Sequence, residues 1–469
     1  MTHLSRRAAL KQSAGVAALA LLGKTVGAAP EFVGWATVPA ILSRIKPPEF
    51  PKRDFDITKF GAVADEAKDS SDAIAQAIAR CSESGGGRVV VPSGVFSTGA
   101  IHLRSNVDLH LSAGSTLKFS RDPRRYLPVV YTRWEGTECW NYSPFVYAYE
   151  QDNIAITGTG TLDGQADCEH WWPWKGRTDC GWSKGQVSQE NARNALMQMG
   201  EKDVPLADRK FGEGHFLRPA FVQPVRGKNI LIEGVTIVNS PMFEINPVMC
   251  SNITVRDVKI ASHGPNNDGC DPDSCIDMLI ENCVFDTGDD CIAIKSGRNR
   301  DGRRLARPSE NIVIRNCRMK DGHGGVTIGS EMSGGVRNIF AEHCVLDSPH
   351  LNEALRFKTN AMRGGAIENV FARNLTIGEI ADAILNIDFY YEEGPKGPEH
   401  PLVRNIDIRD VTCRKAKHAV YARGFRDAPI RNVRIENCKF DHVLEANVVD
   451  NVQDFMLDGV TMNGKKINV

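Results

Sequence analysis

The chain lacks an excess of charge of either sign. Its 469 residues include 57 lysines and arginines against 58 aspartates and glutamates, a formal net charge of -1. This balance gives no sign of a nucleic acid or an anionic membrane surface as partner. An anionic ligand would have to be met by a local group of basic residues. The 42% hydrophobic and 25% charged residues are those of an ordinary soluble globular protein.

The chain also lacks a cysteine pattern typical of a disulfide framework. It has thirteen cysteines, an odd number, and their positions favour another explanation. Four of them, Cys283, Cys317, Cys344 and Cys438, occupy one equivalent position of a repeat described below. We expect these to be buried thiols stacked in a core, rather than disulfides or metal ligands.

The first residues predict an export signal. Arg6 and Arg7 precede a short apolar run that ends in small residues at Ala28 and Ala29, which is the pattern of a twin-arginine type signal peptide over residues 1–29. The apolar run has no polar face and is too short to span a bilayer comfortably. We therefore expect a periplasmic or secreted protein, delivered already folded, in which residues 30–54 form a Pro-rich linker.

A short repeat organises the chain from about residue 150 onward. Phrases such as NILIEGVTIVNS, NITVRDVKIASH, NIVIRNCRMKDG and NVRIENCKFDHV open with Asn or Asp and alternate apolar with polar residues. Period two predicts strands, and recurrence every two to three dozen residues predicts stacked coils with insertions at one edge. The sixth residue after the opening position is always small or apolar and should face inward: Val235, Val258, Cys283, Cys317, Cys344, Leu375, Val411 and Cys438. The opening asparagines predict a ladder of side-chain amides between coils.

Coils of short parallel strands without intervening helices predict an all-β fold, a single-stranded right-handed parallel β-helix over residues 55–469. Its N-terminal end needs a cap. Ile74, Ala77, Ile78 and Cys81 form an apolar stripe at helical spacing, and 85–87 is a run of glycines that ends the helix. We therefore expect one domain with an N-terminal capping helix.

One long insertion, at about 165–218, interrupts the repeat. It is dense in aromatic residues, with Trp171, Trp172, Trp174 and Trp182 in close succession. These side chains could cover the edge of the coils, or their faces could stack on sugar rings beside a carbohydrate site. The second alternative makes Trp172 a candidate substrate-binding residue.

Acidic residues fall on one stripe of the predicted coils. Counted from the opening residue of each phrase, Asp289 and His323 occupy the same position in successive coils, and Asp268 lies slightly later in the preceding coil. Residues equivalent in neighbouring coils lie about 4.8 Å apart. Asp289 and Asp290 are adjacent in the chain, and Asp268 lies one coil away. Carboxylates this close raise one another's proton affinity, so one of the three can stay protonated while the other two remain ionised. Inverting hydrolysis of a glycosidic bond needs this division between an acid and a base.

The same stripe ends in two cations, Arg356 and Lys358, in the coil after His323. Because the protein as a whole is neutral, cations at this place would suit an acidic sugar. A calcium loop is the alternative for the acidic stretch NNDGCDPDS, but the spacing of an EF-hand and its distal Glu are absent.

These residues together resemble glycoside hydrolase family 28, the polygalacturonases, over the chain from about Phe55 to the C-terminus. The family motifs Asn-Thr-Asp, Gly-Asp-Asp, Gly-His-Gly and Arg-x-Lys match NND (266–268), GDD (288–290), GHG (322–324) and RFK (356–358). Two middle positions depart from the family: Asn267 stands where Thr is usual, and Phe357 where Ile is usual. Neither removes a functional group.

The resemblance implies a role for each matched residue. Asp289 would be the general acid, Asp268 and Asp290 would activate water, and His323 would support the acid. The substrate would be bound by Arg356, Lys358, Asn266, Gly324 and Trp172. The resemblance further implies inversion at the anomeric carbon, with no metal and no cofactor.

A closer resemblance is to the bacterial exo-acting branch, the galacturonan 1,4-α-galacturonidases, through HWWPWKG, FGEGHFLRP, GPNNDG and GSEMSGGVRN. It implies release of single galacturonic acids from the non-reducing end of a pectic polysaccharide or oligogalacturonide. The alternatives are an endo-polygalacturonase, a rhamnogalacturonan or xylogalacturonan hydrolase, a calcium-dependent pectate lyase and a non-catalytic polysaccharide-binding β-helix.

Overall fold

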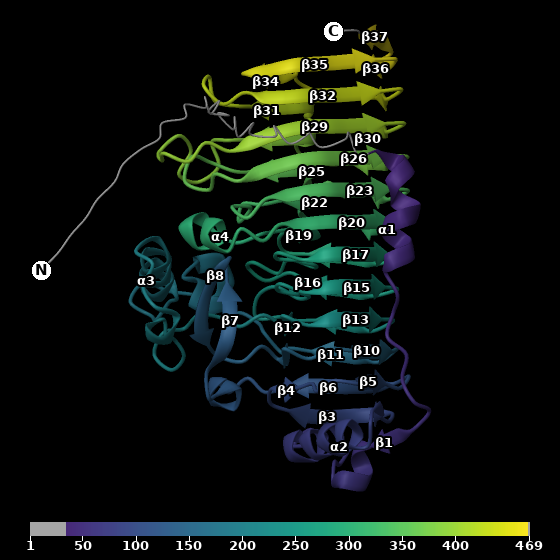
Figure 1. Ribbon diagram of the computed structural model, residues 1–469, viewed down its shortest axis with the longest axis vertical. Helices are drawn as coiled ribbons and strands as arrows, with labels where there is room; N and C mark the ends of the chain where they lie inside the picture. The colour runs from purple at the N-terminus through teal and green to yellow at the C-terminus, as the bar shows by residue number, and fades with distance from the viewer. Residues whose placement is uncertain (1–33, 468–469) are drawn as a thin grey trace, which may run out of the picture.

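The computed structural model describes residues 34–467, and its strands stack into one long column of coils (Figure 1). Most neighbouring strands are parallel, and each coil contributes one strand to each of two 13-stranded sheets. A third face is completed by shorter sheets. This is the right-handed parallel β-helix that the sequence predicts. The predicted signal peptide, residues 1–29, lies outside the described residues.

The sheets follow chain order along the column. The first consists of β1 (Asp54–Asp56), β2 (Gly87–Val91), β5 (Val107–Leu111), β10 (Ile154–Gly158), β13 (Lys228–Glu233), β15 (Ser251–Arg256), β17 (Ile276–Glu281), β20 (Ser309–Arg315), β23 (Val336–Glu342), β26 (Ala366–Arg373), β29 (Leu402–Arg409), β32 (Ile430–Glu436) and β35 (Val452–Asp458). The second consists of β3 (Gly94–Thr98), β6 (Ser115–Phe119), β11 (Thr161–Asp163), β14 (Thr236–Val238), β16 (Lys259–Ser262), β18 (Val284–Thr287), β21 (Arg318–Met319), β24 (Val345–Leu346), β27 (Thr376–Glu379), β30 (Thr412–Lys415), β33 (Lys439–Phe440), β36 (Val460–Met462) and β37 (Lys465–Ile467).

The third face has two sheets, joined by isolated bridges between Ile245, Cys270 and Ile292. They are β4 (Ile101–His102), β9 (Val146–Tyr149) and β12 (Val222–Val225), followed by β19 (Ile292–Ile294), β22 (Gly322–Ile328), β25 (Leu351–Lys358), β28 (Ala383–Asp388), β31 (His418–Arg423) and β34 (Val448–Asp450). The pair β7 (Val130–Trp134) and β8 (Thr137–Asn141) forms an antiparallel hairpin outside the column.

The interior of the column is one continuous apolar core. The predicted inward-facing position is buried in all eight phrases, and its four cysteines are buried free thiols, as expected. On the outside, the predicted asparagine ladder is present: Asn338 Nδ2 donates to Asn311 Oδ1 at 3.1 Å, and Asn369 Nδ2 donates to Asn338 Oδ1 at 3.1 Å. These asparagines have φ near +58°, a left-handed conformation that Asn tolerates better than most residues. The same asparagines therefore adopt the backbone conformation that the turns require and hydrogen-bond their side chains between coils.

Helix α2 (Ser71–Glu83) closes the N-terminal end of the column, as predicted (Figure 1). Its stripe of Ile74, Ala77, Ile78 and Cys81 is buried against the first coils. The helix ends at a run of glycines with positive φ, a conformation that glycine adopts without steric cost.

The segment predicted as a linker, residues 30–54, includes packed structure. Helix α1 (Val38–Arg44) lies along the flank of the column (Figure 1). Its Val38 and Ile41 pack on a row of outward-facing apolar residues of the first sheet that includes Val313 and Phe340. The short run of apolar residues around a Pro gave no clear helical period, so only the partner surface explains the helix.

The insertion lies between β11 and β12 and forms a side layer with the hairpin β7–β8 (Figure 1). It contains α3 (Glu190–Glu201), and Leu196 packs with Trp134 of the hairpin and Phe243 of the column in a second apolar cluster. Helix α4 (Asn299–Leu305) adjoins α3. The remaining helical turns are 3-10: Trp35–Thr37, Ile57–Phe60, Pro123–Tyr126, Trp172–Lys175, Thr178–Cys180 and Leu206–Asp208. Among residues 34–467, no helix has the length and apolar character to cross a membrane.

Candidate active site

The predicted stripe of acids and cations is present on one face of the column. Asp268 follows β16, Asp289 and Asp290 follow β18, and His323 belongs to β22. The predicted register is confirmed, because the His323 amide donates to the Asp289 carbonyl at 3.0 Å. Arg356 on β25 is one coil further along. Stacking of the coils thus brings residues from four successive phrases together.

Three carboxylates meet at the centre of the stripe. Asp268, Asp289 and Asp290 each offer an oxygen within 4.8 Å of an oxygen of the others. Asp268 and Asp290 are buried, and the Asp289 side chain keeps 17% of its surface exposed. Like charges this close cannot all ionise without compensation. The neighbouring groups therefore decide where charge remains.

Asp290 is the carboxylate with the most partners. Its Oδ1 accepts hydrogen bonds from Thr327 Oγ1 at 3.0 Å and Arg356 Nη1 at 3.2 Å, and its Oδ2 accepts one from Lys358 Nζ at 2.6 Å. Burial works to raise the pKa of Asp290, but Lys358 and Arg356 outweigh it and lower that pKa. The two cations predicted to hold a substrate carboxylate thus already hold Asp290 in the free protein.

Asp289 is paired with His323. The Nδ1 of His323 lies 2.9 Å from Asp289 Oδ1. Burial works against ionisation of Asp289, but the hydrogen bond and charge of His323 keep its pKa below the ordinary value. The same hydrogen bond raises the pKa of His323, against a smaller effect of burial. In the free protein the pair is therefore an imidazolium with a carboxylate.

Asp268 has the opposite tendency. Burial and the charge of Asp289 raise its pKa well above the ordinary value, and Lys295 opposes them from 3.6 Å. The two acids thus have opposite tendencies: their surroundings favour the protonated form of Asp268 and the ionised form of Asp289. The resemblance assigns the acid role to Asp289, so a proton must change places before the reaction it implies.

A cavity of about 430 Å³ opens directly above the stripe. Asp289, His323 and Arg356 line its floor. Lys175 and Arg177 of the insertion also line it. Beyond Asp289, a second space of about 120 Å³ is lined by a set rich in charge: Glu135, Lys175, Arg193, Asp268, Lys295, Arg298, Glu331, Lys358 and Glu392.

Two of the residues predicted to bind substrate, Trp172 and Gly324, are not among those that line these cavities. The indole of Trp172 donates to the Ser240 carbonyl at 2.9 Å and packs against Gly264, where a Cβ would come within 2.2 Å of the ring. Gly324 is buried, and a Cβ there would lie 2.9 Å from Asp290 Oδ1. A side chain at 324 would displace Asp290. Gly324 therefore supports the site from behind, whereas Trp172 is partly exposed and is in the lining of neither cavity.

Asn266 and Asn267 have different environments. Asn266 lines both cavities, and its Oδ1 accepts a hydrogen bond from the buried Arg218 at 2.8 Å. Asn267, the departure from the family motif, is fully buried. Its Nδ2 donates to the carbonyls of Ser240 and Met242, and its Oδ1 accepts from the Gly264 amide at 2.7 Å. Asn267 therefore fixes the loop that carries Asp268.

Several lining residues were not found from the sequence. Lys175 and Tyr391 line both cavities, and Lys295 and Glu331 line the inner one. Lys295 stands in the stretch GDDCIAIKSG and Glu331 in GSEMSGG, so proximity to recognised motifs was the available signal. Tyr391 lies in a loop without a motif. Its ring centroid is 5.4 Å from Lys358 Nζ, a contact that only the stacking of coils creates.

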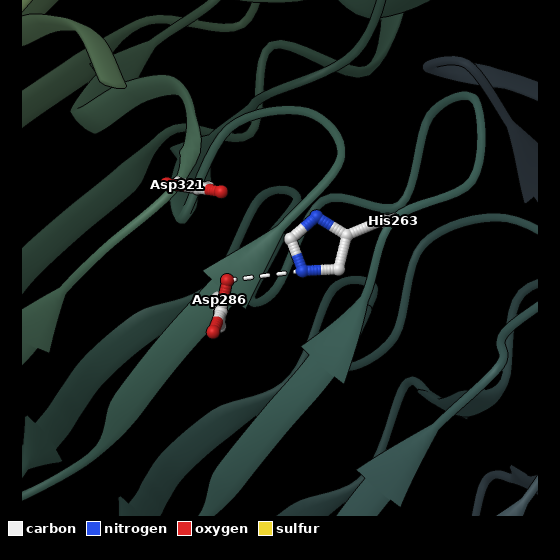
Figure 2. A group of neighbouring side chains, drawn as sticks. All are labelled: His263, Asp286 and Asp321. Carbon is white, nitrogen blue, oxygen red and sulfur yellow. Dashed lines mark ion pairs between the residues drawn. The ribbon is translucent and has the colours of Figure 1, made fainter. Parts of the chain in front are cut away.

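His263, Asp286 and Asp321 form a group of neighbouring side chains (Figure 2), of which His263 lines the outer cavity. One ligand atom from each falls within 4.8 Å of the others, and His263 Nε2 is 3.0 Å from Asp286 Oδ1. Lys320 Nζ lies 3.3 Å from the other oxygen of Asp286, and Asp321 accepts a hydrogen bond from Ser348. Because Asp286 is paired with both Lys320 and His263, we assign the group to holding His263 in the lining of the outer cavity.

Comparison with known proteins agrees with this geometry. The family model for glycosyl hydrolases family 28 matches residues 208–461. The crystal structure of an exopolygalacturonase from Thermotoga maritima superposes with a TM-score of 0.90 at 43% identity, over 92% of this chain and 97% of that one. The chain belongs to glycoside hydrolase family 28. Membership of this family explains the fold, the register of the coils and the presence of the four motifs together.

More distant relatives of this family 28 hydrolase carry related names. A probable polygalacturonase from Vitis vinifera is 27% identical over 81% of this chain and 73% of its own length. An exo-poly-alpha-D-galacturonosidase from Dickeya chrysanthemi is 28% identical over 76% of this chain and 62% of its own. The site of this family 28 enzyme accordingly contains the acids that hydrolysis of a glycosidic bond requires.

Proposed function

We propose that this enzyme releases single galacturonic acid units from the non-reducing end of α-1,4-linked galacturonan. The main support is the cavity pair: the outer space has the insertion as one wall, and the inner space ends among charged side chains behind Asp289. A pocket with one blocked end accepts a chain terminus, whereas an endo-acting enzyme needs a groove open at both ends. The name of the Thermotoga relative supports the same substrate.

The charges of the pocket suit a uronic acid. The protein has a net charge of -1, but Lys175, Arg177, His323 and Arg356 are gathered around the outer cavity. Arg356 has Nη1 3.2 Å from Asp290 Oδ1 and Nε 3.6 Å from Glu353 Oε2, and it lines the outer cavity, where its guanidinium would also meet a substrate carboxylate. The acidic sugar would thus be met by local cations in an otherwise neutral protein.

The proposed mechanism uses the protons that the site already contains. Asp289 would protonate the leaving oxygen, and Asp268 and Asp290 would orient and deprotonate water. Since oxygens of Asp268 and Asp289 lie within 4.8 Å, the proton held by Asp268 at rest can pass to Asp289 when substrate binds. That one transfer produces both the ionised base and the protonated acid. His323 would then stabilise the Asp289 anion after it has given up the proton.

Inversion is part of the proposal and has its own test. Carboxyl groups of inverting enzymes are usually about 6.5–9.5 Å apart, while nearest oxygens here are within 4.8 Å. Three acids rather than two are present, so Asp268 and Asp290 could hold one water from the same side. Proton NMR of the first product should show the β-anomer before mutarotation. An α-anomer as first product would contradict inversion.

The experiment for the function is a time course on polygalacturonic acid with the mature protein, with products separated by size. We expect saturated galacturonic acid monomer from the first points. A mixture of oligomers would instead indicate endo action, and an ultraviolet-absorbing unsaturated uronate would indicate a lyase. If no product forms, rhamnogalacturonan and xylogalacturonan are the next substrates, and failure on all of them would contradict hydrolysis.

We further propose export through the twin-arginine signal at residues 1–29, to the periplasm or beyond. The support is the Arg6–Arg7 pair and the apolar run that follows. In a bacterial host with that pathway, replacing both arginines with lysine should retain the protein in the cytoplasm, while Arg44→Lys should not. Equal periplasmic fractions of all three proteins would contradict the proposal.

A further inference from the structure

Lys295 is a buried ammonium beneath the catalytic stripe, at the end of β19. Its side chain is 4% exposed. Its Nζ lies 3.6 Å from Asp268 Oδ2, 3.8 Å from Asp271 Oδ2 and 3.5 Å from Glu331 Oε2. It is thus nearly equidistant from three carboxyl groups and shares one positive charge among them.

The surroundings of Lys295 contain more acid than base. Among residues 34–467, neither oxygen of Asp271 has a hydrogen-bond partner, and Glu244 lies on the preceding coil. Both side chains are fully buried. The aromatic ring of Phe243 has its centroid 4.8 Å from Nζ. A buried charge in such a place acts strongly on its neighbours.

We propose that Lys295 is a positioning residue that keeps Asp268 ionised during the reaction and so leaves the shared proton on Asp289. This inference rests on the proposed function, because it assigns the base role to Asp268 and the acid role to Asp289. Asp290 needs no such help, since Lys358 and Arg356 bind it directly. Within the described residues 34–467, the ion pair of Asp268 is with Lys295 alone.

Other charges also act on this pair of groups. Those that face Asp268 are Glu244, Asp271, Asp289, Asp290, Lys295, Lys358 and Arg218. Those that face Lys295 are Asp268, Asp271, Asp290, Glu331 and Lys358. Burial works against the charge of Lys295, but the surrounding acids raise its pKa well above the ordinary value. Lys295 therefore stays charged while it opposes protonation of Asp268.

Removing the charge of Glu331 should change the proton affinity of Asp268 in the opposite direction from removing the charge of Lys295. Glu331 is ionised, because the charges of Lys295 and Arg298 outweigh burial and hold its pKa well below the ordinary value. Its carboxylate therefore offsets part of the Lys295 charge that would otherwise act on Asp268. Removing the Lys295 charge should make Asp268 bind its proton more tightly, and removing the Glu331 charge should make it bind less tightly.

The experiment compares kcat and KM against pH for the wild type, Lys295→Met, Lys295→Arg and Glu331→Gln on tri-galacturonate. For Lys295→Met we expect kcat to fall at least tenfold with KM within threefold. The acidic limb of its profile should move to higher pH by about one unit or more. Lys295→Arg should recover most of that shift. Glu331→Gln should move the same limb to lower pH.

The outcomes separate this inference from the function. If Lys295→Met keeps its circular dichroism spectrum and loses kcat equally at every pH, with the limb unmoved, Lys295 is structural and the inference is wrong. A rise of KM at unchanged kcat would make Lys295 a substrate ligand and would equally overturn it. If Lys295→Met does not fold, the limb shifts of Lys295→Arg and Glu331→Gln decide. Absence of hydrolysis by the wild type would refute the proposed function first.

Discussion

Asp268 and Asp290 are almost equally buried, yet their pKa values move in opposite directions. Asp290 has an ammonium at 2.6 Å and a guanidinium at 3.2 Å, so its charge is compensated at hydrogen-bond distance. Asp268 has one shared ammonium at 3.6 Å, and its Oδ1 has no hydrogen-bond partner. Burial alone would protonate both. The partners of each residue, and not its exposure, decide which of them carries the proton.

The Asp289→Asn variant tests the acid role. The amide keeps the shape of the carboxyl group but has no proton to deliver, so we expect kcat to fall by about 10²- to 10⁴-fold with little change in substrate binding. Steady-state kinetics and calorimetric binding of an oligogalacturonide would measure the two effects. Asp257→Asn, at an exposed turn, is the matched control. Turnover at the wild-type rate in Asp289→Asn would contradict the assignment.

The pH dependence of kcat should report His323. The pKa of His323 is raised from the ordinary 6.5. The imidazolium, which favours departure of the Asp289 proton, is therefore present below this raised pKa and is lost as pH rises through it. We expect the alkaline limb of the kcat profile to lie above pH 6.5. The limb should be absent in His323→Gln, which should also be slower at low pH. An identical alkaline limb in both proteins would show that another group titrates.

At the scale of elements, the outside of each coil depends on the asparagine ladder. Asp277 takes the place of an asparagine in it and forms an ion pair with Arg44 of α1 at 2.6 Å. The aspartate at this ladder position therefore gives α1 an ion pair in addition to its apolar contacts. The position of α1 on the flank is a property of the two elements together, because seven helical residues are too few to be stable in isolation.

Variants of Asn338 distinguish the contribution of its side-chain hydrogen bonds from that of its tolerance for a left-handed backbone. Ala at this position would lose two hydrogen bonds and adopt φ near +58° with a Cβ, whereas Gly would lose the same bonds without strain. We expect Asn338→Ala to lower the free energy of unfolding by about 1–2 kcal/mol more than Asn338→Gly. Melting temperatures and urea titrations would measure the difference. Equal destabilisation would mean that the hydrogen bonds alone matter.

At the scale of the whole molecule, the column fixes the spacing of the site residues, and the side layer forms a wall of the cavity above them. Each coil is bonded to its neighbours along three faces, so acids from different phrases keep a constant spacing. The hairpin β7–β8, the insertion and α4 then enclose one end of the stripe. The side layer is joined to the column by apolar packing, because Trp171 of the insertion belongs to the core of the column and Phe243 of the column belongs to the second cluster.

Local features of the sequence were sufficient to predict much of this protein. Period-two alternation, the repeated asparagine and the inward position occupied by Cys283 and its equivalents are each contained in a dozen consecutive residues. They predicted strands and coils, and the helical spacing of Ile74, Ala77, Ile78 and Cys81 predicted the capping helix. Once the coils are known, counting residues places His323 beside Asp289, because equivalent positions in adjacent coils are neighbours. Four ordered motifs then predicted the family.

Only the tertiary structure decided how the charges are shared. Lys295, Glu331 and Tyr391 reach the site from loops and strand ends whose positions no local period determines, and Trp172 packs on Gly264 of the cavity lining. The location of the proton on Asp268 depends on burial and on the distance to Lys295. Electrostatic interactions act through space between residues distant in the chain, so sequence spacing specifies the acids, while the folded environment determines their charge.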